Sequence, residues 1–200
     1  MSELAHSQLP KSTVRSMRLF AVLSIIGGGL HVLQPIWNRY LNYQTLRFDV
    51  ISGSTDLISA IMVLLGAIAF FIYQQHAKSV NQLISYILLF IGMSLYISMK
   101  TIQTFVVPML KYNAPNLADS PPSPASEGMM IMFMAFAISW VYFGISSMIA
   151  RNLPLVGSIL VTVAPFIDFI PMGNSPIEGP QVWGVGVIWL SLAVYRRVKV

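Results

Sequence analysis

Three ionisable side chains lie in apolar stretches of the sequence: His31, Lys100 and Asp168. Placing a charged side chain at the centre of a membrane-spanning helix costs about 2.5–3.5 kcal/mol. Side chains kept at that cost commonly bind an ion or ligand, move a proton, or pair with one another. These three are therefore the first candidates for function.

Two neutral polar side chains accompany them. Gln34 lies one helical turn after His31, and Gln103 lies one turn after Lys100. A helix rises ~1.5 Å per residue, which places His31, Asp168 and Lys100 roughly 18, 20 and 27 Å from the cytoplasmic ends of their helices. The five side chains together predict a polar cavity that opens to the outside and binds a small ligand.

The surroundings of Asp168 favour such a site. It lies between Pro165 and Pro171, and prolines inside a helix free backbone carbonyls, which is how broken helices build ion or substrate sites. The alternative is that the helix ends near Pro165 and that Asp168 belongs to an outer loop.

A purely structural role is the main alternative for the whole cluster. An ion pair or hydrogen-bond network would then fix the packing of the helices, with Lys100 extending its amine to the outer headgroups. Asp56 follows Ser54 and Thr55, and we interpret it as part of a helix start, where a hydroxyl caps the helix and the carboxylate favours the positive end of its dipole. We assign Asp56 no chemistry.

Several kinds of chemistry have no support in the sequence. Cysteine is absent, which excludes disulfides and thiolate metal sites. His31 is expected in the outer half of the membrane and His76 at the cytoplasmic end of the second helix, so they do not form a haem or zinc site. No nucleophile elbow, metalloprotease box or nucleotide-binding fingerprint occurs. We expect no metal, no cofactor and no catalytic residues, and we lean against an enzyme.

The elements that must position these side chains are membrane-spanning helices. The chain has 56% hydrophobic and only 10% charged residues, whereas soluble domains have roughly a quarter charged residues. Runs of about 20 apolar residues can cross a bilayer as helix. Four runs meet that length, at 19–37, 57–77, 79–99 and 128–150, and two shorter runs lie at 155–170 and 181–195. The sequence thus predicts an all-α, polytopic integral membrane protein with a six-transmembrane-helix bundle.

The basic residues predict the orientation of this bundle. With both termini in the cytoplasm, eight basic residues fall inside: Lys11, Arg15, Arg18, Lys78, Arg151, Arg196, Arg197 and Lys199. Only Arg39, Arg47 and Lys111 fall outside. This is the asymmetry of the positive-inside rule, and we expect the protein in the cell membrane with both termini cytoplasmic.

The domain organisation follows from these spans. We expect a basic cytoplasmic leader at 1–18, transmembrane helices 1–3 within 19–110 with an outer loop at 38–53, and a Pro/Ser-rich outer linker at 111–127. Transmembrane helices 4–6 follow within 128–195, and 196–200 form a basic cytoplasmic tail. Gly27, Gly28 and Gly29 lie inside the first span and favour a close helix crossing or a kink.

Three functions fit these features. The first is a non-catalytic small-ligand binding, carrier or sensor module, the second is an auxiliary or structural subunit of a membrane complex, and the third is a membrane-embedded enzyme. The expected partners are the lipid bilayer, anionic lipids at the cytoplasmic face, and a membrane-protein partner or a second copy of the chain. The basic residues lie at helix ends and form no aromatic-interleaved patch, so we expect no nucleic acid.

Overall fold

The computed structural model describes residues 10–41, 45–74, 79–119, 123–167 and 178–198, and every regular element in these ranges is a helix. This confirms the predicted all-α class. The six main helices are α2 (Lys11–Leu41), α3 (Leu46–Gln74), α4 (Val80–Thr101), α7 (Ala125–Ala150), α8 (Leu155–Ile167) and α9 (Gly179–Arg197). Between α4 and α7 lie a π-helical segment, η2 (Ile102–Val106), and the short helices α5 (Val107–Asn113) and α6 (Pro115–Asp119).

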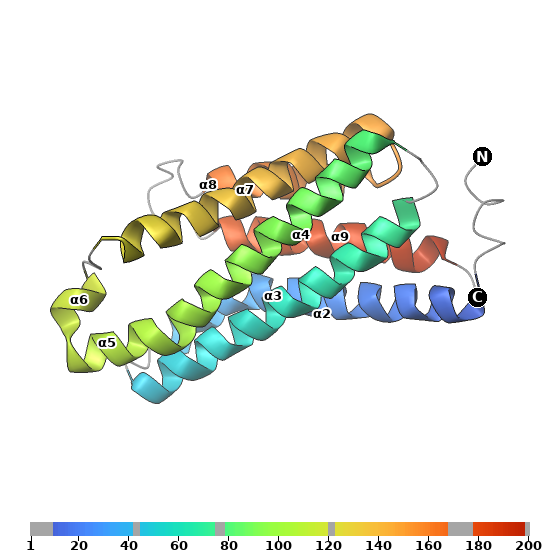
Figure 1. Cartoon of the computed structure of the whole chain (residues 1–200). Helices are drawn as coiled ribbons and strands as arrows, with labels where there is room; N and C mark the ends of the chain where they lie inside the picture. Colours follow the sequence, from blue (N-terminus) through green and yellow to red (C-terminus); the bar gives the residue numbers. More distant parts are fainter. Residues whose placement is uncertain (1–9, 42–44, 75–78, 120–122, 168–177, 199–200) are drawn as a thin grey trace.

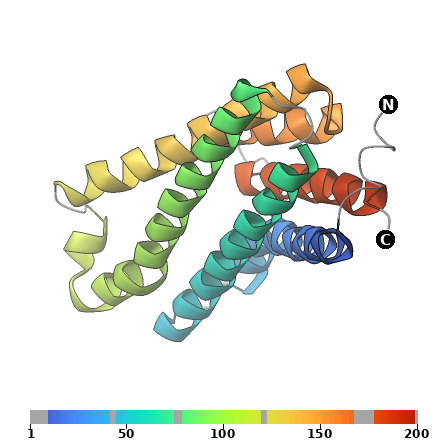
Figure 2. The same cartoon turned by 45° about the vertical axis from the view of Figure 1, so that its right-hand side comes forward.

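The main helices form a closed ring. Each packs on the next main helix along the chain, and α9 returns to pack on α2; the neighbouring helices can be followed in Figures 1 and 2. The first and last helices meet where the Arg18 Nε donates a hydrogen bond of 2.9 Å to the Val198 carbonyl. The Arg18 guanidinium also lies 5.2 Å from the centre of the Tyr195 ring. The start of α2 and the end of α9 therefore lie at the same end of the molecule, which we name the termini end.

Aromatic side chains fill much of the interior of the ring. Trp140 of α7 is fully buried, and its ring centre lies 5.6 Å from that of Phe143 and 5.2 Å from that of Trp183 of α9. Phe143 in turn stacks on Phe70 of α3 at 5.9 Å. Edge-to-face and offset contacts at these distances stabilise a core beyond the burial of area alone. The interior at this level is packed with side chains rather than open as a pore.

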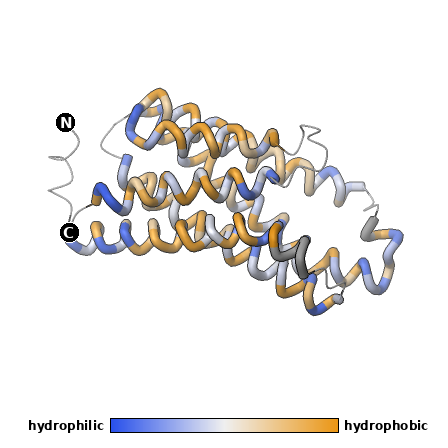
Figure 3. Tube along the Cα trace, turned by 180° about the vertical axis from the view of Figure 1, so that it is seen from behind, coloured by the Kyte–Doolittle hydropathy of each residue, from blue (hydrophilic) through white to orange (hydrophobic). Residues whose placement is uncertain are grey.

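The outer surface of the helices is apolar. Hydrophobic residues line most of each helix, and hydrophilic ones gather towards the helix ends (Figure 3). Four helical stretches are long and apolar enough to cross a membrane: Lys11–Ile36, Leu46–Gln74, Val80–Asn113 and Ala125–Ala150. The helix α8 has only thirteen residues, and α9 is not among these four.

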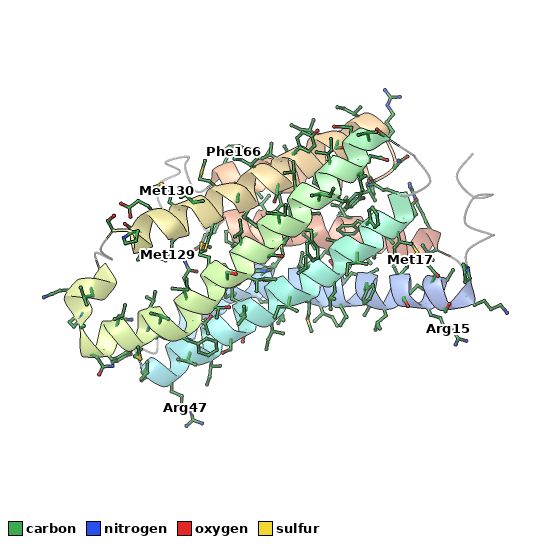
Figure 4. All side chains as sticks on the ribbon, viewed as in Figure 1. Arg15, Met17, Arg47, Met129, Met130 and Phe166 are labelled. Atoms are coloured by element: carbon green, nitrogen blue, oxygen red, sulfur yellow. The ribbon has the colours of Figure 1, made fainter. Side chains whose placement is uncertain are left out.

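The two segments expected as the outer loop and the outer linker contain helical residues. The expected outer loop at 38–53 holds the last turn of α2 and the first turns of α3, and the expected linker at 111–127 holds the end of α5 and all of α6. Polar residues at these ends do not stop the helices, because side chains there find partners: the Thr45 hydroxyl accepts a bond of 3.3 Å from the Phe48 N–H, and Lys111 pairs with Asp49 at 3.1 Å. Arg47 projects outward at this end, far from Arg15 at the termini end (Figure 4).

The three consecutive glycines of α2 serve different purposes. A Cβ on Gly28 would lie 2.8 Å from the backbone carbonyl of Gly184 in α9, whereas a Cβ on Gly29 would meet nothing within 4 Å. A Cβ on Gly27 would lie 2.7 Å from the carbonyl of Ser59 in α3. Gly27 and Gly28 therefore permit the close helix crossing that the sequence predicts.

Candidate functional site

Three ionisable side chains from three consecutive helices meet inside the ring. The Asp56 carboxylate of α3 accepts from the Lys100 ammonium of α4 at 2.6 Å. Its other oxygen lies 3.0 Å from Nδ1 of His31 in α2. The angle of this contact does not meet hydrogen-bond geometry. His31 is 1%, Asp56 4% and Lys100 19% exposed. We name these three residues the ion cluster.

Chain topology explains why they meet. His31 lies ten residues before the end of α2, and Asp56 lies ten residues after the start of α3. Because α2 and α3 are antiparallel neighbours, equal distances from their connection place both side chains at one level, about 15 Å from those helix ends. Lys100 reaches the same level near the end of α4. The cluster thus lies towards the end of the molecule opposite the termini end.

The carboxylate and the ammonium neutralise each other. Each would be costly alone in an apolar interior, and a short charge-assisted hydrogen bond offsets part of that cost. The Lys100 Nζ also lies 5.1 Å from the centre of the Tyr96 ring, one turn earlier on α4, a distance at which a cation is attracted to the ring. The Lys100–Asp56 pair as a whole therefore carries no net charge.

Two ring nitrogens lie beside the cluster without a described partner. The His31 and Trp183 rings meet edge to face with centres 4.7 Å apart. His31 Nε2 and Trp183 Nε1 are both buried and have no hydrogen-bond partner among the described residues. In addition, Pro35 has no N–H to donate to the backbone carbonyl of His31, four residues earlier in α2. A buried polar group without a partner costs about 1–3 kcal/mol, and this cost applies to the two ring nitrogens.

A cavity of about 40 Å³ lies beside the cluster. Its walls include Trp183, which contacts His31, and Tyr96, which contacts Lys100. Phe133 and Phe136 of α7, Ala164 and Pro165 of α8, and Gly179 and Pro180 of α9 complete the lining. A volume of this size holds a few water molecules or a small polar group.

The structure places the residues singled out by sequence as follows. His31 and Lys100 lie in one cluster because both contact the Asp56 carboxylate. Gln34 is partly buried in α2, and Gln103 is exposed in η2, so its side chain faces away from the interior. Asp168 lies outside the described residues.

The interpretation of Asp56 as part of a helix start is wrong. The helix α3 begins at Leu46, so Asp56 lies in its third turn and is buried. The sequence carries a signal for this placement, because the buried residues Ser52, Asp56, Ser59 and Val63 recur at helical spacing on one face. The carboxylate lies on the core-facing stripe of α3, which the uncharged run starting at Leu57 did not reveal.

The donor set does not resemble a metal centre. Among the described residues, no group of three or more His, Cys, Asp or Glu side chains lies close enough to hold a metal ion. The third member of the ion cluster is Lys100, whose ammonium donates hydrogen bonds and has no lone pair to offer. The arrangement suits hydrogen bonding and charge pairing.

Comparison with known proteins gives no relative: no family model, no curated protein and no solved structure matches this chain. The fold and composition define a helical protein of membrane type, with four helices long and apolar enough to span a bilayer. The functional argument rests on the ion cluster and its surroundings.

Proposed function

We propose that all six main helices span the cell membrane, with both chain termini in the cytoplasm. The closed ring supports this topology, because α8 and α9 pack on each other and join α7 to α2. The contact between Arg18 and the end of α9 supports an even number of crossings. The termini end carries Lys11, Arg15, Arg18, Arg196 and Arg197, which attract anionic lipid headgroups and favour the cytoplasmic side.

Single-cysteine labelling of this cysteine-free chain tests the topology. Ser123 and Ser79 are both exposed and lie at opposite ends of the molecule. We expect a membrane-impermeant maleimide added to intact cells to label Ser123→Cys and to leave Ser79→Cys unlabelled until the cells are opened. If intact cells label Ser79→Cys and not Ser123→Cys, the orientation is opposite to the proposed one.

We propose that the protein is a non-catalytic membrane module that binds a small polar ligand at the ion cluster, as a carrier or a sensor. The observation that carries this proposal is the pair of buried ring nitrogens, His31 Nε2 and Trp183 Nε1. They lie beside the Asp56 carboxylate, whose charge is balanced by Lys100. His31 Nδ1 lies 3.0 Å from the Asp56 carboxylate; with the ring proton on Nδ1, His31 presents an acceptor at Nε2, while Trp183 presents a donor. A molecule with one hydroxyl or amide group satisfies both nitrogens.

The proposed site keeps His31 and Lys100 of the predicted site and has Asp56 in place of Asp168. It does not include Gln34 or Gln103. The proposed entry is the cavity beside Trp183, at the end opposite the termini. In the proposed topology that cavity belongs to the outer half of the membrane.

A thermal-shift screen of small polar metabolites against the purified protein tests this function. A compound that binds the native state raises the melting temperature by mass action. We expect at least one compound to do so, and we expect Trp183→Phe, which keeps a ring but removes the N–H, to weaken its binding about threefold to tenfold. Trp189→Phe is the matched control, because Trp189 lies on the same helix and is 49% exposed.

Two outcomes would count against the ligand-binding proposal. One is equal weakening by Trp183→Phe and Trp189→Phe. The other is a screen without any stabilising compound together with a protein that co-purifies stoichiometrically. The second result would favour the auxiliary-subunit function, in which the ion cluster only holds α2, α3 and α4 together.

A further inference from the structure

A groove runs along the outside of the ring between α3 and α4, towards the termini end. It consists of two adjoining cavities of about 280 and 290 Å³, which share Phe71, Leu83 and Tyr86. The first is lined by apolar side chains, the others being Ala67, Ile68, Ile87, Phe90 and Ile91. The second lies nearer the helix ends and adds the polar residues Gln74, Ser79 and Gln82. The groove is thus apolar along its length and polar at one end.

The polar end contains two half-satisfied amides. Gln82 Nε2 donates to Gln74 Oε1 at 3.3 Å. The other halves, Gln74 Nε2 and Gln82 Oε1, are buried and have no hydrogen-bond partner among the described residues. The two side chains are only 3% and 5% exposed. One amide donor and one amide acceptor without a described partner therefore belong to two residues that line this cavity.

The dimensions of the groove match one leaflet of a bilayer. Gln82 and Ile91 are nine residues apart on α4, which corresponds to about 13 Å along the helix. Half of a hydrocarbon core is about 15 Å thick. Leu83, Ile87, Phe90 and Ile91 are each about half exposed, so the groove is open sideways to the surrounding medium.

We propose that this groove binds one glycerophospholipid of the leaflet at the termini end. Its acyl chain lies along the apolar part, an ester carbonyl accepts a hydrogen bond from Gln74, and an amine or hydroxyl of the headgroup donates to Gln82. The described lining residues include no Lys, Arg or His, and in this proposal the groove selects its lipid by hydrogen bonding to the two glutamines. The proposal is independent of the ligand at the ion cluster.

Native mass spectrometry with two matched lipids tests this selection. Dioleoyl phosphatidylethanolamine and dioleoyl phosphatidylcholine have the same chains and net charge, but only the ethanolamine headgroup has N–H donors. We expect the wild-type protein to retain phosphatidylethanolamine about threefold to tenfold better, the effect of one hydrogen bond. Gln82→Leu should remove the preference, while Gln103→Leu, on an exposed glutamine at the opposite end, should keep it. Equal retention of the two lipids by the wild type would overturn the proposal.

Two tryptophan variants test where the lipid binds without changing the buried glutamine side chains. Ile87 lines the groove, whereas Ile84, also on α4, is not among the lining residues, and the two are 51% and 43% exposed. We expect Ile87→Trp to fill the groove and lower the number of retained phosphatidylethanolamine molecules by one. Ile84→Trp should leave that number unchanged. The same lipid count in both variants would overturn the proposed site.

Discussion

Asp56→Asn will destabilise the protein by about 3 kcal/mol, because it leaves the Lys100 ammonium without its anionic partner. Breaking a buried ion pair on one side costs about 3–5 kcal/mol, and the lower end applies since Lys100 is 19% exposed. The variant keeps the size of the side chain, so no cavity contributes. Reversible unfolding in detergent with a denaturant titration gives the free energy of unfolding.

The same helix supplies the control for this prediction. Asp49 pairs with Lys111 at 3.1 Å, but the two side chains are 26% and 52% exposed, and exposed pairs contribute less than about 1 kcal/mol. Asp49→Asn should therefore have little effect. Lys100→Met combined with Asp56→Asn should cost less than the sum of the single changes, since the two residues interact directly. Equal effects of Asp56→Asn and Asp49→Asn would show that the ion cluster does not hold the helices together.

Gly28→Ala will destabilise the contact between α2 and α9 by about 1–3 kcal/mol. The new Cβ would lie 2.8 Å from the Gly184 carbonyl and 2.9 Å from the Ile188 side chain. The carbonyl belongs to the backbone, so relief requires the two helices to move apart. The measurement is again the free energy of unfolding in detergent.

Gly29→Ala is the matched control one residue away. A Cβ there meets nothing within 4 Å, and alanine favours helix over glycine by up to about 1 kcal/mol. We therefore expect Gly28→Ala to lower the free energy of unfolding and Gly29→Ala to raise it. The same sign and size at both positions would contradict the close crossing of α2 and α9.

The fold follows from hydrophobicity to a large extent. In the part of the chain that the structure describes, the four long apolar runs of the sequence all lie in helices, α2, α3, α4 and α7. What hydrophobicity could not give is where α2 ends and α3 begins, because the helical residues at 38–41 and 46–53 include polar and charged types that lie outside the apolar runs. The helices of the 111–127 segment were missed for a similar reason, since proline is tolerated at the first position of a helix such as α6.

The candidate site was predicted in part. His31 and Lys100 were recognised because ionisable groups in apolar surroundings need a partner. Asp56 was missed because the second span was assumed to begin where its charges end, whereas α3 begins at Leu46. Once that start is known, the antiparallel register of α2 and α3 brings Asp56 level with His31. Trp183 was missed because its contact with His31 depends on the closure of α9 onto α2, which joins residues distant in the sequence.

The most direct test of the proposed function is to observe His31 while a ligand binds. The chain has three histidines, His6, His31 and His76, so ¹⁵N-histidine labelling gives few signals, and His31→Gln assigns the relevant ones. On addition of the compound with the largest thermal shift, we expect the ring nitrogen signals of His31 to move while those of His6 and His76 stay in place. A compound that stabilises the protein but leaves the His31 signals unchanged would contradict ligand binding at the ion cluster.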